Sequence, residues 1–121
     1  MFDPKFDRRQ ARSENTQLAL TRFLEASRHA AELEALALAD ELGLLMAGAG
    51  AAELCDELAA VAPLFGSASN VLGSGTEVRR LAVDGFELFI SGRGAQLEST
   101  LARVAAGCAR ILIEKKSRLA H

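Results

Sequence analysis

Tryptophan and tyrosine are absent from this 121-residue sequence, which has only two cysteines and two histidines. Without those aromatic side chains, the chain lacks the stacking platforms typical of proteins that bind single-stranded nucleic acid. Cys55 and Cys108 do not have the C-x-x-C spacing of a redox or zinc site, and two histidines are too few for useful metal ligation. We therefore expect no cofactor, no metal site and no nucleic-acid partner, and two buried, unreactive thiols.

Neither sign of charge dominates, because 14 basic and 16 acidic side chains give a net charge of −2. Such a balance produces no global field that would attract nucleic acid or an anionic lipid surface. The N-terminal segment lacks the apolar core of a secretion signal, and no segment has the roughly 18 uninterrupted apolar residues of a membrane span. The sequence thus favours a cytoplasmic protein that does not insert into membranes.

No arrangement of residues for catalysis is evident. Ser27, Ser67 and Ser91 lack plausible histidine and aspartate partners to activate a hydroxyl group. Three short glycine-rich runs lack the spacing of phosphate-binding loops. We therefore predict no catalytic residue and no enzyme activity.

A basic segment precedes the first periodic pattern. Residues 1–13 contain one proline and three arginines with little apolar pattern, which predicts a flexible arm before a single domain at 14–118. From Asn15 onward, apolar residues recur at helical spacing. Because asparagine is a good N-cap, we expect the first helix to begin at Asn15.

The segment LEALALADELGLLMAGAG, which begins at Leu33, allows two interpretations. Its alanine, leucine and glutamate residues favour a helix, and propensity alone predicts one helix over 15–47. Short apolar runs bounded by turn residues instead favour strands at 34–39 and 44–47, with a tight turn at 40–43. Glycines in the turn and after the second run favour the strands.

Two later segments carry the periodicity of amphipathic helices. Residues 52–65 have apolar side chains at i, i+4 and i+7 and acidic residues in the first turns, which predicts a helix that ends around Leu64. Its alanine-rich face is wider than packing on one small sheet requires, which indicates self-association. A loop of small residues is expected at 67–75, and a long helix at 95–118.

The strongest local signal is a β-hairpin. Strands at 78–83 and 86–90 flank an Asp-Gly pair, which supplies the positive φ angles of a type I′ turn. Arg79 and Arg80 interrupt the alternation of the first strand, which predicts an exposed edge or a bulge there.

The order helix, β-hairpin, helix, β-hairpin, helix resembles the roadblock/dynein light chain family, and bacterial roadblock-type domains in particular. The resemblance is carried by LALADELGLLMAGAG, with its Asp40-x-x-Gly43 turn, and by AAELCDELAAVAPLF, and it covers about residues 16–115. It implies an α+β fold (an α/β sandwich), with the middle helix on one face of an antiparallel sheet and the other two helices on the opposite face. The family usually has five strands, whereas four are clear here; a fifth is either within 70–75 or missing.

The resemblance also implies function. It implies a dimer, with itself or with another roadblock subunit, formed through the middle helix and the strand after it. It further implies a non-enzymatic regulator or scaffold for a small Ras-like GTPase. The candidate dimer contacts are Leu54, Cys55, Leu58, Ala59, Ala62, Val78 and Leu81. The candidate partner contacts, where charge could steer association, are Glu53, Asp56, Glu57, Arg79 and Arg80.

Two alternatives stay open. A ligand-sensing domain of the GAF or PAS kind would need a pocket between sheet and helix with convergent polar groups. An all-helical adaptor would need the segment from Leu33 to Ala47 to remain helical.

Overall fold

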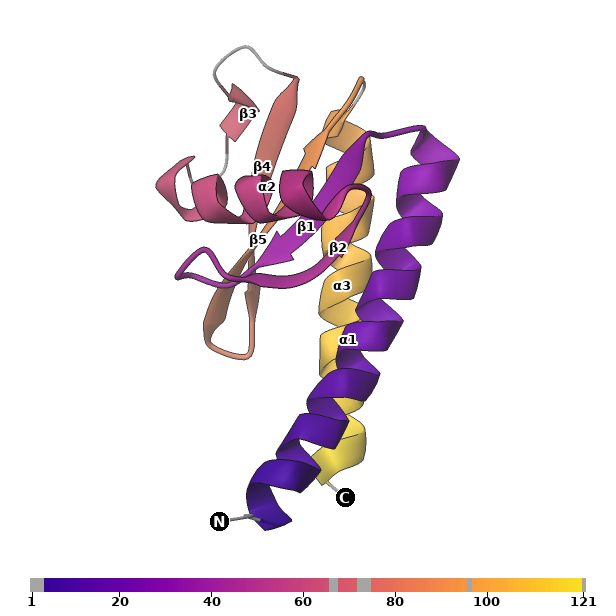
Figure 1. The fold of residues 1–121 in the computed structure, drawn as a ribbon, viewed down its shortest axis with the longest axis vertical. Helices are drawn as coiled ribbons and strands as arrows, with labels where there is room; N and C mark the ends of the chain where they lie inside the picture. Colours follow the sequence, from indigo (N-terminus) through magenta and orange to yellow (C-terminus); the bar gives the residue numbers. More distant parts are fainter. Residues whose placement is uncertain (1–3, 66–67, 72–74, 96, 121) are drawn as a thin grey trace.

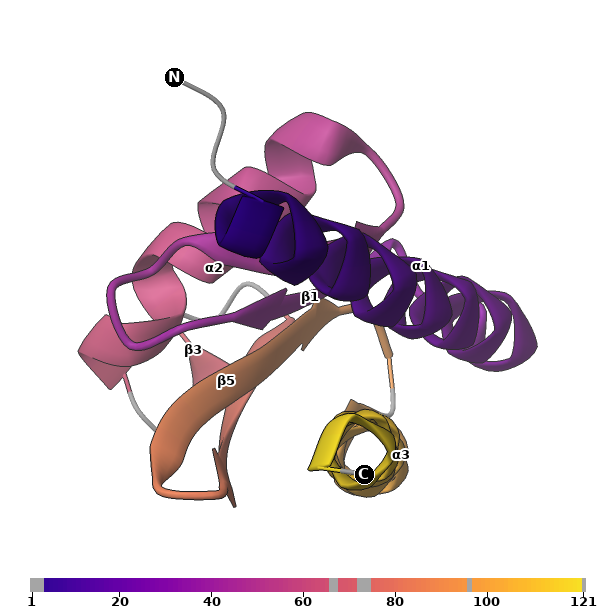
Figure 2. The ribbon, with the colours of Figure 1, turned by 90° about the horizontal axis from the view of Figure 1, so that it is seen from below.

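The computed structural model describes residues 4–65, 68–71, 75–95 and 97–120, with side chains over 15–64, 75–95 and 100–113. One antiparallel sheet lies between a single helix and a pair of helices (Figures 1 and 2). The described strands have the spatial order β2-β1-β5-β4-β3. The α+β sandwich predicted from the sequence is therefore confirmed. Its elements are α1 (Pro4–Ala31), β1 (Ala35–Ala39), β2 (Leu45–Ala49), α2 (Ala52–Phe65), β3 (Ala68–Val71), β4 (Thr76–Val83), β5 (Phe86–Arg93) and α3 (Leu97–Ala120).

The interior strand β1 alternates small and large side chains. Leu36 and Leu38 point into the larger core, which α1 and α3 cover, whereas Ala35 and Ala37 point toward α2. β1 pairs with β2 on one side and β5 on the other, so every one of its residues is buried. The strand interpretation is thus confirmed and the all-helical one is wrong. Leucine and alanine favour helices in isolation, but two flanking strands and two covered faces outweigh that preference.

The turn between β1 and β2 is held by Asp40. Its Oδ1 accepts hydrogen bonds from the backbone N–H groups of Leu42 and Leu44, at 2.9 and 3.0 Å. Gly43 has a φ of 82°, a left-handed conformation that glycine adopts without strain. The tight turn predicted at 40–43 is confirmed, and β2 extends two residues further than expected.

The second hairpin has the turn that its sequence predicts. Asp84 and Gly85 have φ angles of 57° and 84°, and β4 and β5 pair in continuous register across the whole hairpin. Of the two alternatives predicted at Arg79 and Arg80, the bulge is wrong, whereas the exposed edge is confirmed, because no described residue of β3 pairs with β4 beyond Val78. The irregularity lies instead between β4 and β3, which pair only near the start of β4.

The fifth strand is β3, within the segment predicted to be a loop. β3 covers Ala68–Val71, so that prediction is wrong for these four residues, while 67 and 72–74 lie outside the described residues. With β3 the sheet has the five strands usual in the roadblock family.

Helix α1 begins at Pro4, so the helix start predicted at Asn15 is wrong, and residues 4–13 form the first turns of this helix. Proline suits the first turn of a helix, where its missing N–H group has no partner to lose. Residues 5–14 contain no glycine and several good helix formers, so the helix is continuous from Pro4 into the segment that begins at Asn15. The domain boundary at residue 14 stays a prediction.

The two faces of the sheet carry separate cores. The larger one joins α1 and α3 to the sheet through residues such as Leu24, Leu38, Ile90 and Cys108. The smaller one lies under α2 and consists of two clusters of buried residues, Ala35, Ala37, Cys55 and Leu58 in one and Ala62, Val78 and Phe89 in the other. α1 and α3 run antiparallel along the first face, so the two chain ends lie at the same end of the molecule (Figure 1).

Candidate interaction surface

Helix α2 crosses the sheet and presents a mixed outer face. Glu53, Asp56 and Glu57 are exposed in its first half, where acidic side chains are favoured by the positive end of the helix dipole. In its second half the exposed residues are Ala60 and Leu64, the latter with 79% of its surface accessible. The outer face of α2 is therefore acidic at one end and apolar at the other.

Most of the candidate dimer residues lie on the inner face of this helix or beneath it. They are buried within their own chain, so they cannot offer contact surface to a second copy while the chain stays folded. Leu54 is only partly buried, and Leu81 belongs to the core on the opposite face of the sheet. The buried members of the set are Cys55, Leu58, Ala59, Ala62, Val78 and Leu81.

The two arginines of β4 project from opposite faces of the sheet. Arg80 lies on the α2 face, where its guanidinium is 6.0 Å from the centroid of the Phe89 ring and 3.0 Å from a carboxylate oxygen of Glu87. Arg79 is exposed on the face that α1 and α3 cover. Successive residues of a strand point to opposite faces, so the structure brings only Arg80 to the same face as the acidic residues of α2.

Sequence reasoning missed an exposed apolar region beside the end of α2. Leu42 and Leu44 are 80% and 62% exposed in the β1–β2 turn. Their neighbour Gly43 lies against α2, since a Cβ built on it would be 3.4 Å from the Cα of Ala60. Leucines on both sides of a turn glycine are the signal that could have revealed this region, because turn residues are usually polar.

The two thiols are held neutral by their surroundings. The Cys55 thiol donates a hydrogen bond to the carbonyl oxygen of Ala49, with a sulfur–oxygen distance of 3.3 Å, and burial raises its pKa. Burial raises the pKa of Cys108 to about 12. Because the thiolate is the nucleophile and the metal ligand, neither cysteine is activated for chemistry, and both are buried as expected. In the described residues no three potential metal ligands cluster together.

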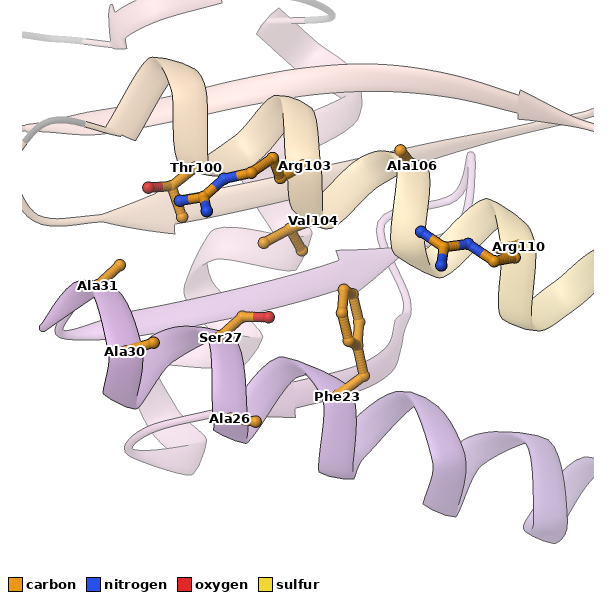
Figure 3. Close-up of a pocket in the computed structure, with 10 residues that line it drawn as sticks. All are labelled: Phe23, Ala26, Ser27, Ala30, Ala31, Thr100, Arg103, Val104, Ala106 and Arg110. Atoms are coloured by element: carbon orange, nitrogen blue, oxygen red, sulfur yellow. The ribbon is translucent and has the colours of Figure 1, made fainter.

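A groove of about 560 Å³ runs between α1 and α3 (Figure 3). Phe23 and Val104 line its floor, and the guanidinium groups of Arg103 and Arg110 lie along its α3 side. The groove is open and lies between two helices. It does not match the pocket between sheet and helix that the ligand-sensing alternative needs.

Comparison with known proteins supports the fold. No protein-family model and no curated protein matches the sequence. The structure is similar to that of Myxococcus xanthus MglB, a roadblock-domain protein, with a TM-score of 0.54. The match covers 95% of each chain at 11% sequence identity. Within the described part of the chain, none of the helices is both long and apolar enough to cross a bilayer. This chain therefore has a roadblock-type fold, as its sequence resemblance implies.

Proposed function

We propose that this chain is a non-enzymatic interaction module that regulates a small Ras-like GTPase. Support comes from the roadblock-type fold, which it shares with MglB, a GTPase-activating protein. The observation that carries the proposal is the outer face of α2, where three exposed carboxylates lie beside exposed apolar residues. Such a surface combines charges that steer association with apolar area that stabilises the complex.

The two halves of this face suit different partners. The acidic half, with Glu53, Asp56 and Glu57, contacts the GTPase and sets the rate and specificity of association. The apolar half, with Ala60 and Leu64, contacts a second roadblock subunit, either another copy of this chain or a related one. Arg80 lies on the same face of the sheet as α2 and extends the charged surface. Arg79 lies on the opposite face and is not part of this surface.

The test begins with purification of the tagged protein from its source cells and reconstitution with the GTPase that accompanies it. Asp56→Lys and Glu57→Lys, made singly, should each raise the dissociation constant by about tenfold or more. Each should also reduce any stimulation of GTP hydrolysis. Glu32→Lys is the matched control, since Glu32 is an exposed acid at the end of α1 and the change in charge is identical.

Two results would contradict the proposal. One is that neither a GTPase nor a roadblock subunit accompanies the protein. The other is that the isolated protein hydrolyses a nucleotide or an ester by itself.

A further inference from the structure

The groove between α1 and α3 is lined by small side chains, as a surface that packs against a third helix would be. Its walls include Ala26, Ala30 and Ala106, whose small side chains allow another helix to come close. Phe23 fills the space below, because α3 has no side chain at Gly107. Its ring and Val104 form a closed apolar floor between the two helices (Figure 3).

Among the described residues that line this groove, both charged side chains are arginines. Arg103 and Arg110 are exposed, and neither forms an ion pair with any acidic side chain that the structure describes. No acidic residue occurs among the described residues that line the groove. The arginines are seven positions apart on one side of α3, which corresponds to about 10.5 Å along the helix axis. The groove is therefore an apolar channel flanked by two cations two helical turns apart.

We propose that this groove binds an amphipathic helix of a partner protein, with two acidic side chains seven residues apart and small or apolar residues facing the floor. A helix repeats its facing direction about every seven residues, so such a helix places both carboxylates opposite the two arginines. Arginine forms strong paired hydrogen bonds with carboxylates, which fixes the position of the helix along the groove. Apolar contact with the floor contributes the remaining affinity, as in other grooves that bind helices.

Two other occupants fit less well. A bilayer surface is flat on this scale, so it reaches the arginines but not the concave floor. In a second copy of this chain, the exposed carboxylates of α2 at 53, 56 and 57 are three or four positions apart, which does not match the spacing of the arginines. Asp7 and Glu14 of α1 do have the seven-residue spacing, but three arginines lie between them and would repel the arginines of the groove. Glu25 and Glu32 have it too, but Glu25 already forms an ion pair with Arg28. The groove also lies on the opposite face of the sheet from α2. Its occupant is therefore independent of the GTPase proposed above.

Selection from a displayed library of helical peptides tests this inference. Each peptide keeps alanine and leucine on one face and varies two positions, seven residues apart, among Glu, Gln and Lys. Selection on the unmodified protein should enrich peptides with Glu at both positions. The double variant Arg103→Glu/Arg110→Glu should bind the selected peptide at least about tenfold more weakly and should itself enrich Lys. Ala30→Phe fills the groove without any change in charge, and it should also abolish binding.

The matched control is Arg22→Glu/Arg79→Glu, which makes the same change in net charge at two exposed arginines that do not line the groove. It should leave peptide binding unchanged, and the melting temperature of each variant shows whether it is folded. The inference is overturned if no peptide is enriched, or if the selected peptides lack the acidic pair. It also fails if only phosphatidylserine vesicles bind through the two arginines, which makes the site a lipid site. The inference is also overturned if the unmodified protein binds no peptide and the Arg103→Glu/Arg110→Glu variant sediments as a smaller species than the unmodified protein. That result would make the occupant of the groove a second copy of this chain.

Discussion

At the scale of single residues, burial decides what each ionisable or reactive group can do. Cys108 packs in the larger core among leucines of α1 and the sheet, and its pKa rises to about 12 because the thiolate would lose its hydration there. The carboxylates of α2, by contrast, are exposed to solvent and accessible to a partner. Residue type therefore sets which groups could ionise or react, and burial in the fold decides which of them do.

Alkaline pH should destabilise the protein through Cys108. Below pH 9.0, the reference pKa of a cysteine thiol, both folded and unfolded chains keep the proton. Between pH 9.0 and about 12 only the unfolded chain ionises, so the free energy of unfolding falls as the pH rises, by up to about 4 kcal/mol. Burial of Cys55 acts in the same direction. Urea unfolding at several pH values should show this fall, and Cys108→Ala should show a flatter profile. Parallel profiles for the two proteins would mean that Cys108 is not buried in a way that suppresses its ionisation.

At the scale of elements, the contact between α1 and α3 depends on one missing side chain. A Cβ built on Gly107 would lie 2.1 Å from Cζ of Phe23, far inside van der Waals contact. Glycine in a helix interior is normally a weakness, but here it allows the Phe23 ring to fit between the helices. The same packing forms the floor of the α1–α3 groove.

Gly107→Ala should therefore destabilise the protein, although alanine is the better helix former by about 1 kcal/mol. Overpacking against Phe23 is expected to cost about 1–3 kcal/mol, measured as a change in the free energy of unfolding in urea. The matched test repeats Gly107→Ala in a Phe23→Ala background, where the substitution should become neutral or stabilising. Finding the same loss in both backgrounds would rule out the packing explanation.

At the scale of the whole molecule, two separate surfaces are available on opposite faces of one sheet. The outer face of α2 is mixed acidic and apolar, and the α1–α3 groove is apolar and basic. Because the two surfaces lie on opposite faces of the sheet, the two partners proposed above would not compete for the same residues.

A charge at Ala60 should break self-association through α2 and leave the fold intact, whereas a charge at Ala59 should disrupt the fold itself. Ala60 is exposed on the outer face, so Ala60→Glu should convert dimers to monomers in analytical ultracentrifugation with little change in melting temperature. Ala59 is fully buried, so Ala59→Glu should lower the melting temperature severely because it buries an unpaired charge. If the unmodified protein is already monomeric at tens of micromolar, on the order of a weak dimer's dissociation constant, dimerisation through this face is ruled out.

The sequence alone determined those features that depend on neighbouring residues. The Asp84–Gly85 turn, the amphipathic α2 and the exposure of its acidic first turns each follow from local backbone preferences and helical spacing, and the structure agrees with all three. The family resemblance added the layer arrangement. Local physics decides these features because the interactions that stabilise them span only a few residues.

Only the tertiary structure decided the rest. β1 is a strand because β2 and β5 satisfy its backbone and two cores cover it, and no local preference of its alanines and leucines contains that information. Arg79 and Arg80 lie on opposite faces as neighbouring residues of any strand do, but which of them shares a face with α2 depends on how β4 packs in the sheet. The α1–α3 groove joins residues about eighty positions apart, so its shape and charge exist only once the two helices pack. Long-range contacts of this kind depend on how whole elements fit together, which a linear pattern does not specify.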